Sequence, residues 1–221
     1  MIYVTGDIHG DFSRFKHAIM RKLKKDDTLI ICGDFGFIWE GTKSEHHILK
    51  KIGELKYRVL FIDGTHENFD LLEKYPEEKW NGGLARVISG NLIHLMRGQV
   101  YEIENKKIFT FGGGHSQDIE IRRESKTWYE REQPTIDEIK EGEKNLADLE
   151  YMVDYIVTHE PPVALKKCLD VDISHRLETD SFFEKISVEC KFKKWFFGKC
   201  HINKQIPPKF HAVFDDIIAL E

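Results

Sequence analysis

Cysteine is scarce in this sequence. The 221 residues include four cysteines, and no two of them form a CxxC pair or part of a regular disulfide framework. No apolar run approaches the ~20 residues that a helix needs to cross a bilayer. The chain starts directly in a strand-like segment, MIYVTG, with no signal-peptide pattern. These absences predict a cytoplasmic protein with reduced thiols and no membrane association.

An excess of positive charge is also missing. The formal net charge is -5 with the 11 histidines counted as neutral. This charge argues against a protein that coats DNA or RNA, although it does not exclude nucleic acid as a substrate. Hydrophobic residues make up 41% and charged residues 32%, which is the balance of a globular protein. The length suits one domain that covers residues 1–221.

Six short runs rich in β-branched and aromatic residues predict largely buried strands. They cover residues 2–5, 28–32, 58–63, 107–111, 154–158 and 194–197. Residues 99–112 predict a β-hairpin that turns near Glu104–Asn105.

Three segments between these strands have the apolar spacing of helices. They are residues 12–23, with Phe12, Phe15, Ile19 and Leu23 on one face, residues 45–55, and residues 135–149, whose apolar stripe includes Ile136. The alternation of strands and helices indicates an α/β layered domain. The polar stretch 115–135 is the best candidate for a long functional loop.

Asp and His residues follow five of the predicted strands. They are Asp7 and His9, Asp34, His66, His159, and His201. In an open α/β sheet, ligands bind beyond the carboxyl ends of the strands, so these side chains are expected at one rim. Carboxylates together with neutral imidazoles suit divalent transition metals such as Mn, Fe, Zn or Ni.

Each of these motifs alone has an ordinary structural explanation. The segment GDIHG can be a tight turn, His159 can terminate a strand, and a single Asp after a strand is often a helix cap. Five Asp or His positions in this order have no explanation from packing. The combination therefore favours a metal site.

The order of the motifs, D-x-H, GD, GxH[DE], a lone His and a final Gly-x-x-His, resembles the metallophosphoesterase (calcineurin-like) superfamily from Asp7 to His201. This resemblance implies a four-layer α/β/β/α sandwich and a two-metal site that activates water to attack phosphorus. It also implies a role for each motif residue: Asp7, His9 and His201 on the first metal, Asp34 as the bridge, His159 on the second metal, and His66 as the group that protonates the leaving oxygen or stabilises the transition state.

Three positions depart from the family's usual motifs. Thr65 stands where the family has an Asn ligand of the second metal, and Lys199 stands where it has a His ligand of the same metal. Phe37 replaces an Asp that commonly supports the catalytic His. A protonated Lys has no lone pair for a metal. We therefore expect one tightly bound metal and a second site that is weak or empty.

Two interpretations stay open. One is a metal-dependent hydrolase of phosphomonoesters or phosphodiesters in which Lys199 supplies the positive charge of the second ion. The other is a catalytically weak or inactive relative that binds a phosphorylated ligand or partner. The candidate substrates are phosphorylated small molecules, nucleotides and phosphoproteins.

Further candidates for substrate contact are Thr65, His115 and Arg122. His115 follows three glycines after a predicted strand, which can let a phosphate approach the backbone, although a Gly-rich hairpin end is an equal alternative. Arg122 can grip a phosphate through two hydrogen bonds, although most loop arginines are simply solvated.

Overall fold

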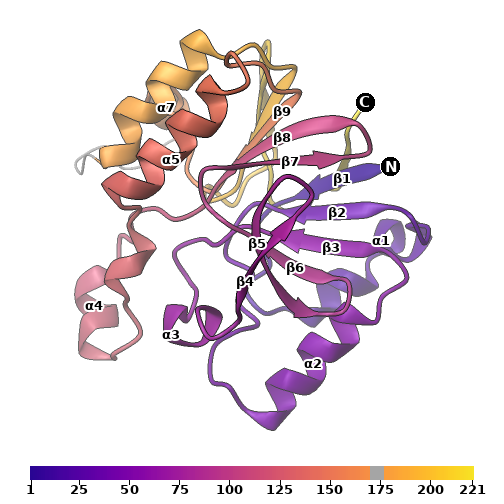
Figure 1. Cartoon of the computed structure of the whole chain (residues 1–221). Coiled ribbons are helices and arrows are strands. Elements are labelled where there is room, and N and C mark those ends of the chain that lie inside the picture. The colour runs from indigo at the N-terminus through magenta and orange to yellow at the C-terminus, as the bar shows by residue number, and fades with distance from the viewer. Residues whose placement is uncertain (170–176) are drawn as a thin grey trace.

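Two mixed β-sheets face each other in the computed structural model, which describes residues 1–169 and 177–221 (Figure 1). The first sheet has the order β13 (Ile218–Ala219), β1 (Ile2–Thr5), β2 (Thr28–Ile31), β3 (Arg58–Phe61), β6 (Leu92–Leu95), β5 (Gly83–Ser89), β4 (Glu77–Trp80). The second has the order β11 (Lys204–Ile206), β12 (Phe210–Ala212), β10 (Lys194–Phe197), β9 (Tyr155–Thr158), β8 (Lys106–Phe111), β7 (Gln99–Ile103).

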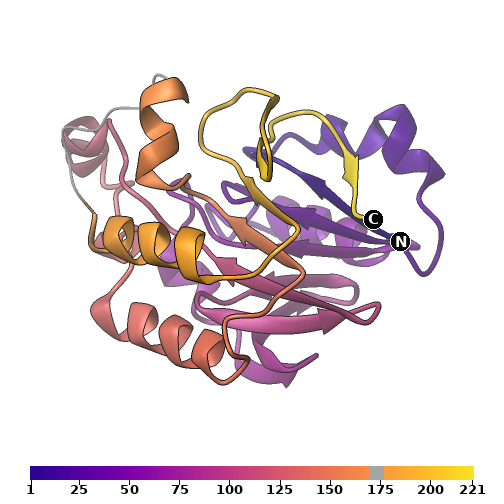
Figure 2. The same ribbon diagram turned by 90° about the horizontal axis from the view of Figure 1, so that it is seen from above.

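Helices cover the outer face of each sheet. In Figure 1, α2 (Lys43–Gly53) lies on the first sheet, whereas α5 (Ile136–Ala147) and α7 (Glu178–Glu189) lie side by side on the second. The shorter helices are η1 (Phe12–Lys16), α1 (Ala18–Lys22), α3 (Phe69–Leu72), α4 (Ile119–Glu124), η2 (Glu130–Glu132), α6 (Val163–Lys166) and η3 (Lys167–Leu169). Seen from above, the two termini lie close together (Figure 2). No helix in the described ranges has the length and apolarity to span a membrane.

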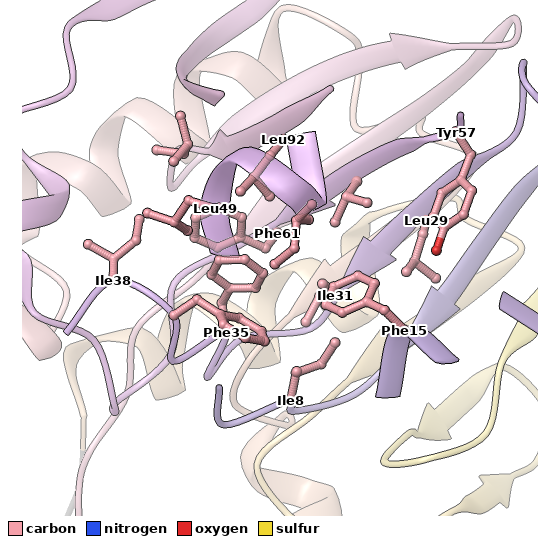
Figure 3. Packing of buried hydrophobic residues seen from close by; sticks show 14 of the residues in the cluster. Ile8, Phe15, Leu29, Ile31, Phe35, Ile38, Leu49, Tyr57, Phe61 and Leu92 are labelled. Carbon is pink, nitrogen blue, oxygen red and sulfur yellow. The ribbon is translucent and has the colours of Figure 1, made fainter. Parts of the chain in front are cut away.

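Three hydrophobic clusters separate four layers. The first lies between the first sheet and its helices, where Phe35 stacks on Phe61 with 4.2 Å between ring centroids (Figure 3). The second fills the space between the sheets, and the third lies under α5 and α7. Successive residues of a strand point to opposite faces, so Leu29 joins the first cluster and Ile30 the second. The expected α/β/β/α sandwich is confirmed.

Most of the predicted elements are present with slightly different bounds. All six predicted strands form, and the hairpin turns at Glu104 and Asn105, which both have positive φ as a type I′ turn requires. The helix predicted over 45–55 is α2. The helix predicted over 135–149 is α5, although Ile136 is 56% exposed and lies outside its apolar stripe.

The single helix predicted over residues 12–23 is wrong. His17 has extended backbone (φ -55°, ψ 146°) and divides the segment into the 3-10 helix η1 and the short helix α1. Phe15 and Leu23 are buried as expected, but Ile19 is 41% exposed. The apolar spacing was correct for the burial of Phe15 and Leu23 but wrong for Ile19 and for helix continuity.

A buried ion pair joins the two sheets near the end of β3. Arg97, in the connection from β6 to β7, donates to Asp63 Oδ2 through Nε at 2.8 Å and Nη2 at 2.7 Å. His94 Nε2 lies 3.1 Å from Asp63 Oδ1. Burial opposes the ionisation of Asp63, but Arg97 and His94 hold its pKa far below the usual range. Asp63 is therefore an anion that the fold requires.

Asp63→Asn should lower the free energy of unfolding by about 3 kcal/mol, because it leaves the buried Arg97 guanidinium without its closest anion. Urea denaturation followed by circular dichroism measures this change. The control is Glu54→Gln, which removes an exposed partner of Lys50 and should cost less than about 1 kcal/mol. Equal stabilities of the two variants would contradict a structural role for the Asp63 pair.

Candidate metal and phosphate site

The carboxyl ends of parallel strands from both sheets meet at one rim. In the first sheet β1, β2 and β3 run parallel, and in the second β9 and β10 run parallel. The turns after these five strands carry the residues that the sequence motifs single out. Side chains from both sheets contact one another there: His201 lies near Asp7, and His159 lies near Asp34.

Four of the predicted metal ligands form one cluster. Asp7, His9, Asp34 and His201 each place one ligand atom within 4.8 Å of all the others. His201 Nε2 lies 3.1 Å from Asp7 Oδ2 and 2.9 Å from His9 Nε2. His9 Nε2 lies 3.8 Å from Asp34 Oδ2. Two carboxylates and two imidazoles converging in this way fit a divalent transition metal.

The electrostatics of the two imidazoles differ. Burial lowers the pKa of His9, which favours the neutral ring that a metal requires. The hydrogen bond to Asp7 raises the pKa of His201. A metal that used both rings would have to displace a proton from His201 more often than from His9, so we expect acidic pH to weaken metal binding.

Unusual backbone conformations are concentrated at this rim. His9, Asp34, Lys199 and His201 have φ values of 48°, 44°, 66° and 49°. Side-chain-bearing residues rarely adopt positive φ, and such strain persists where the surrounding structure demands it. Here the sharp turns direct side chains from three different loops toward the same site.

Two glycines leave room for the carboxylates. A Cβ at Gly64 would lie 2.0 Å from Asp34 Oδ1, and a Cβ at Gly198 would lie 2.2 Å from Asp7 Oδ1. Both distances are far below van der Waals contact. The loops after β3 and β10 can therefore approach the ligand carboxylates only with glycine at these positions.

Asp34 is the most connected of the acidic groups. Its Oδ1 accepts hydrogen bonds from the backbone amides of Thr65 at 2.6 Å and His66 at 2.8 Å. Its Oδ2 accepts from His66 Nδ1 at 3.0 Å. Although burial opposes ionisation, His159, His66 and Lys199 hold the pKa of Asp34 well below its usual range.

His159 has a buried nitrogen without a hydrogen-bond partner. Its Nδ1 donates to the carbonyl oxygen of Cys32 at 3.0 Å, so Nε2 carries a lone pair. Nε2 has no partner in the described structure and lies 3.5 Å from Asp34 Oδ1. Two acceptors facing each other at this distance fit a cation between them. His159 Nε2 and Asp34 Oδ1 are thus two atoms that could contribute to a second cation position.

Lys199 lies beside this second position. Its ammonium donates to Thr65 Oγ1 at 3.1 Å and to the carbonyl oxygen of His115 at 2.8 Å. It also lies 3.8 Å from Glu160 Oε1. Thr65 and Lys199, the two departures from the family's motifs that fall on the second metal, are thus in direct contact with each other.

A buried carboxylate that lies outside the sequence motifs, that of Glu160, forms an ion pair with Lys199. Glu160 accepts a hydrogen bond from the His115 amide at 3.1 Å and lies 3.3 Å from Lys166 Nζ. Burial opposes its ionisation, but Lys199 and Lys166 lower its pKa. In the sequence only its place directly after His159 marks Glu160 as close to the site.

Arg122 reaches the site from the segment predicted as a functional loop, which contains α4. The guanidinium is buried and donates to the carbonyl oxygen of Thr65 at 2.9 Å and to Ser116 Oγ at 2.6 Å. It also pairs with the buried Glu132. The Arg122 guanidinium is therefore hydrogen-bonded to protein acceptors. His115 contacts the site through its backbone, whose carbonyl oxygen accepts from Lys199 and whose amide donates to Glu160.

A pocket of about 390 Å³ opens over the cluster. Its lining includes Asp34, His66, Lys199 and His201. His66 Nδ1 is directed to Asp34, so Nε2 is the nitrogen nearer the other lining residues, 3.9 Å from Asp118 Oδ2. The pocket therefore combines metal ligands, an ammonium and an imidazole edge.

A family model described as calcineurin-like phosphoesterase matches residues 1–197. The chain belongs to this family. The match covers Asp7, His9, Asp34, His66 and His159 and ends before His201, whose place in the site rests on the geometry above. Family membership implies metal-dependent hydrolysis of phosphoesters in general. None of the curated proteins matches the chain.

His201→Asn should weaken the binding of a transition metal by about tenfold or more, because it removes one of four converging ligand atoms. Elemental analysis after dialysis and calorimetric titration with Mn measure this change. His46→Asn is the matched control, since His46 is exposed and, among residues 1–169 and 177–221, its ring is hydrogen-bonded only to the Thr42 carbonyl oxygen. Unchanged metal affinity in His201→Asn would remove His201 from the ligand set.

Proposed function

We propose that this protein hydrolyses phosphomonoesters or phosphodiesters with one tightly bound divalent metal. The Lys199 ammonium supplies much of the positive charge that a second metal would supply. The observation that carries the proposal is the cluster of Asp7, His9, Asp34 and His201 at a pocket that also presents His66 and Lys199. The family match supports the reaction type.

A bound metal at this cluster supplies Lewis acidity and lowers the pKa of water, so that a nucleophile exists at neutral pH. The residues around it orient the substrate. Asp34 holds His66 through Nδ1, so a proton on Nε2 is the one available to the leaving oxygen. This geometry supports the general-acid role of His66.

Lys199 contributes positive charge on the side of His159. Its hydrogen bonds to Thr65 and His115 fix the ammonium, and Glu160 balances its charge. A fixed ammonium attracts a phosphoryl oxygen and stabilises the charge that develops in the transition state. We assign Thr65 and Arg122 to positioning, because both act on the loop that carries His66.

We also propose that the protein is cytoplasmic and that residues 1–221 form a single domain. All four cysteines are free thiols, which supports a reducing compartment. The proposed substrates are phosphorylated small molecules, nucleotides or phosphoproteins, and manganese is the proposed metal.

A second candidate function is the binding of a phosphorylated ligand without turnover. The observation that favours it is the contact between Thr65 and Lys199, which takes the place of two ligands of the second metal. Activity measurements separate the two functions.

With added Mn, the wild-type protein should hydrolyse chromogenic phosphomonoesters or phosphodiesters, and Asp34→Asn should abolish the activity. His66→Asn should lower kcat about 100-fold without loss of bound metal, because it removes a proton donor and no metal ligand. Initial rates and elemental analysis of the same preparations measure both effects. Wild-type rates no higher than those of Asp34→Asn would favour the binding function, and loss of metal from His66→Asn would contradict the general-acid role.

Wild-type protein should retain about one equivalent of transition metal after dialysis. The Lys199 ammonium and a second dication repel each other by several kcal/mol at an effective dielectric constant of ~20. The double variant Thr65→Asn, Lys199→His should raise the content toward two equivalents and increase diesterase turnover. Two tightly bound metals in the wild type would contradict the one-metal proposal.

A further inference from the structure

Asp118 faces the proposed catalytic histidine from across the pocket. Its Oδ2 lies 3.9 Å from His66 Nε2, and both residues line the 390 Å³ pocket. The sequence motifs do not include Asp118, which lies in the polar stretch before α4. Its side chain is 45% exposed, so it is accessible to a bound molecule.

The usual structural role of such an aspartate is absent. Asp118 is the N-cap residue of α4, where an Asp side chain normally accepts a hydrogen bond from the first turn of the helix. Here the side chain makes no capping hydrogen bond. Within the described structure, its ion pairing within 4 Å is with His66. The carboxylate is therefore directed to the pocket and is not used to stabilise the helix.

The position of Asp118 relative to His66 is built into the fold. The amide of Arg122 donates to the Asp118 carbonyl oxygen at 3.0 Å within α4. The buried Arg122 guanidinium donates to the carbonyl oxygen of Thr65, the residue before His66, and to Ser116 Oγ. One buried side chain thus ties together the two segments that carry Asp118 and His66.

The charges of the pocket are arranged asymmetrically. Lys199 is bonded to Thr65 and His115, on the side of Glu160. Asp118 stands on the side of His66 Nε2, where a leaving oxygen would take its proton. A group attached to the leaving oxygen would therefore lie near the Asp118 carboxylate. If that group is negatively charged, the carboxylate repels it, because like charges a few ångström apart repel.

We propose that Asp118 is a specificity determinant that reads the leaving group. It accepts a hydrogen bond from a hydroxyl or amino group on the leaving alcohol, and it rejects leaving groups that carry a carboxylate or a further phosphate. The substrate class is thus phosphoesters of uncharged or cationic alcohols, and nucleoside polyphosphates are disfavoured as anhydride substrates. This inference rests on the proposed hydrolase function and names the substrate class of the same site.

The test compares two esters of similar size, glycerol 3-phosphate and 3-phosphoglycerate, which differ in a terminal hydroxymethyl or carboxylate group. With Mn-loaded protein, kcat/KM and the dissociation constant by calorimetry are measured for each. Wild-type protein should prefer glycerol 3-phosphate by about fivefold or more, the scale expected for a half-exposed charge. Asp118→Asn should bring the two esters within about twofold, mainly by improving 3-phosphoglycerate.

Glu120→Gln is the matched control, because it removes one exposed negative charge from the same helix two residues away, on the opposite face. It should keep the wild-type preference. An equal preference in wild type and Asp118→Asn would overturn the inference while leaving the hydrolase proposal intact. If no ester is hydrolysed, the hydrolase proposal fails, and the ratio of dissociation constants still decides whether Asp118 discriminates between the two molecules.

Discussion

The buried carboxylate of Asp34 is the group on which the geometry of the site depends. It stands at the end of β2 with a positive φ and accepts two backbone amides from the loop after β3. The same carboxylate faces His159 from the second sheet and His9 from the turn after β1. One anion thus connects three loops of the first sheet with one of the second. Burying an anion is costly unless it is paired, and here imidazoles, amides and an ammonium provide the pairing.

Charge balance explains how the unusual second position is tolerated. The Lys199 ammonium, on a side chain that is 14% exposed, needs a nearby anion, and Glu160 supplies it. Glu160 is in turn balanced by Lys166, which pairs with Asp180 at the start of α7. The alternating charges run from the pocket to the helical layer of the second sheet. The substitution at Lys199 is therefore embedded in a network and is not an isolated change at the rim.

The loop around α4 is linked to the segment that carries His66 through the buried Arg122 side chain. The Arg122 guanidinium donates to protein acceptors and thereby links Thr65 with Ser116. This fixes the wall of the pocket that carries Asp118 opposite His66. The motif residues form the candidate metal cluster, whereas this wall, which lies outside the motifs, presents the Asp118 carboxylate to the pocket.

Much of the fold follows from local pattern. Continuous apolar runs identified β1, β2, β3, β8, β9 and β10, because central parallel strands are buried on both faces. Strands β4, β5 and β6 were not predicted: the edge strand β4 is exposed and charged and lacks such a run, whereas β5 and the buried β6 were missed although they carry apolar residues. The helix over residues 12–23 was wrong because apolar spacing does not detect a break such as the one at His17, after which Ile19 is exposed and Met20 is buried.

For the site, the sequence by itself determined which strand ends carry Asp and His, because short motifs and their order are local properties. Only the tertiary structure decided what those residues touch. The contact of Lys199 with Thr65 spans 134 positions, and neither residue alone indicates the other. Glu160, Arg122 and Asp118 acquired their roles in the same way. Their chemistry depends on which loops the two facing sheets bring together, and that is a property of packing between distant segments.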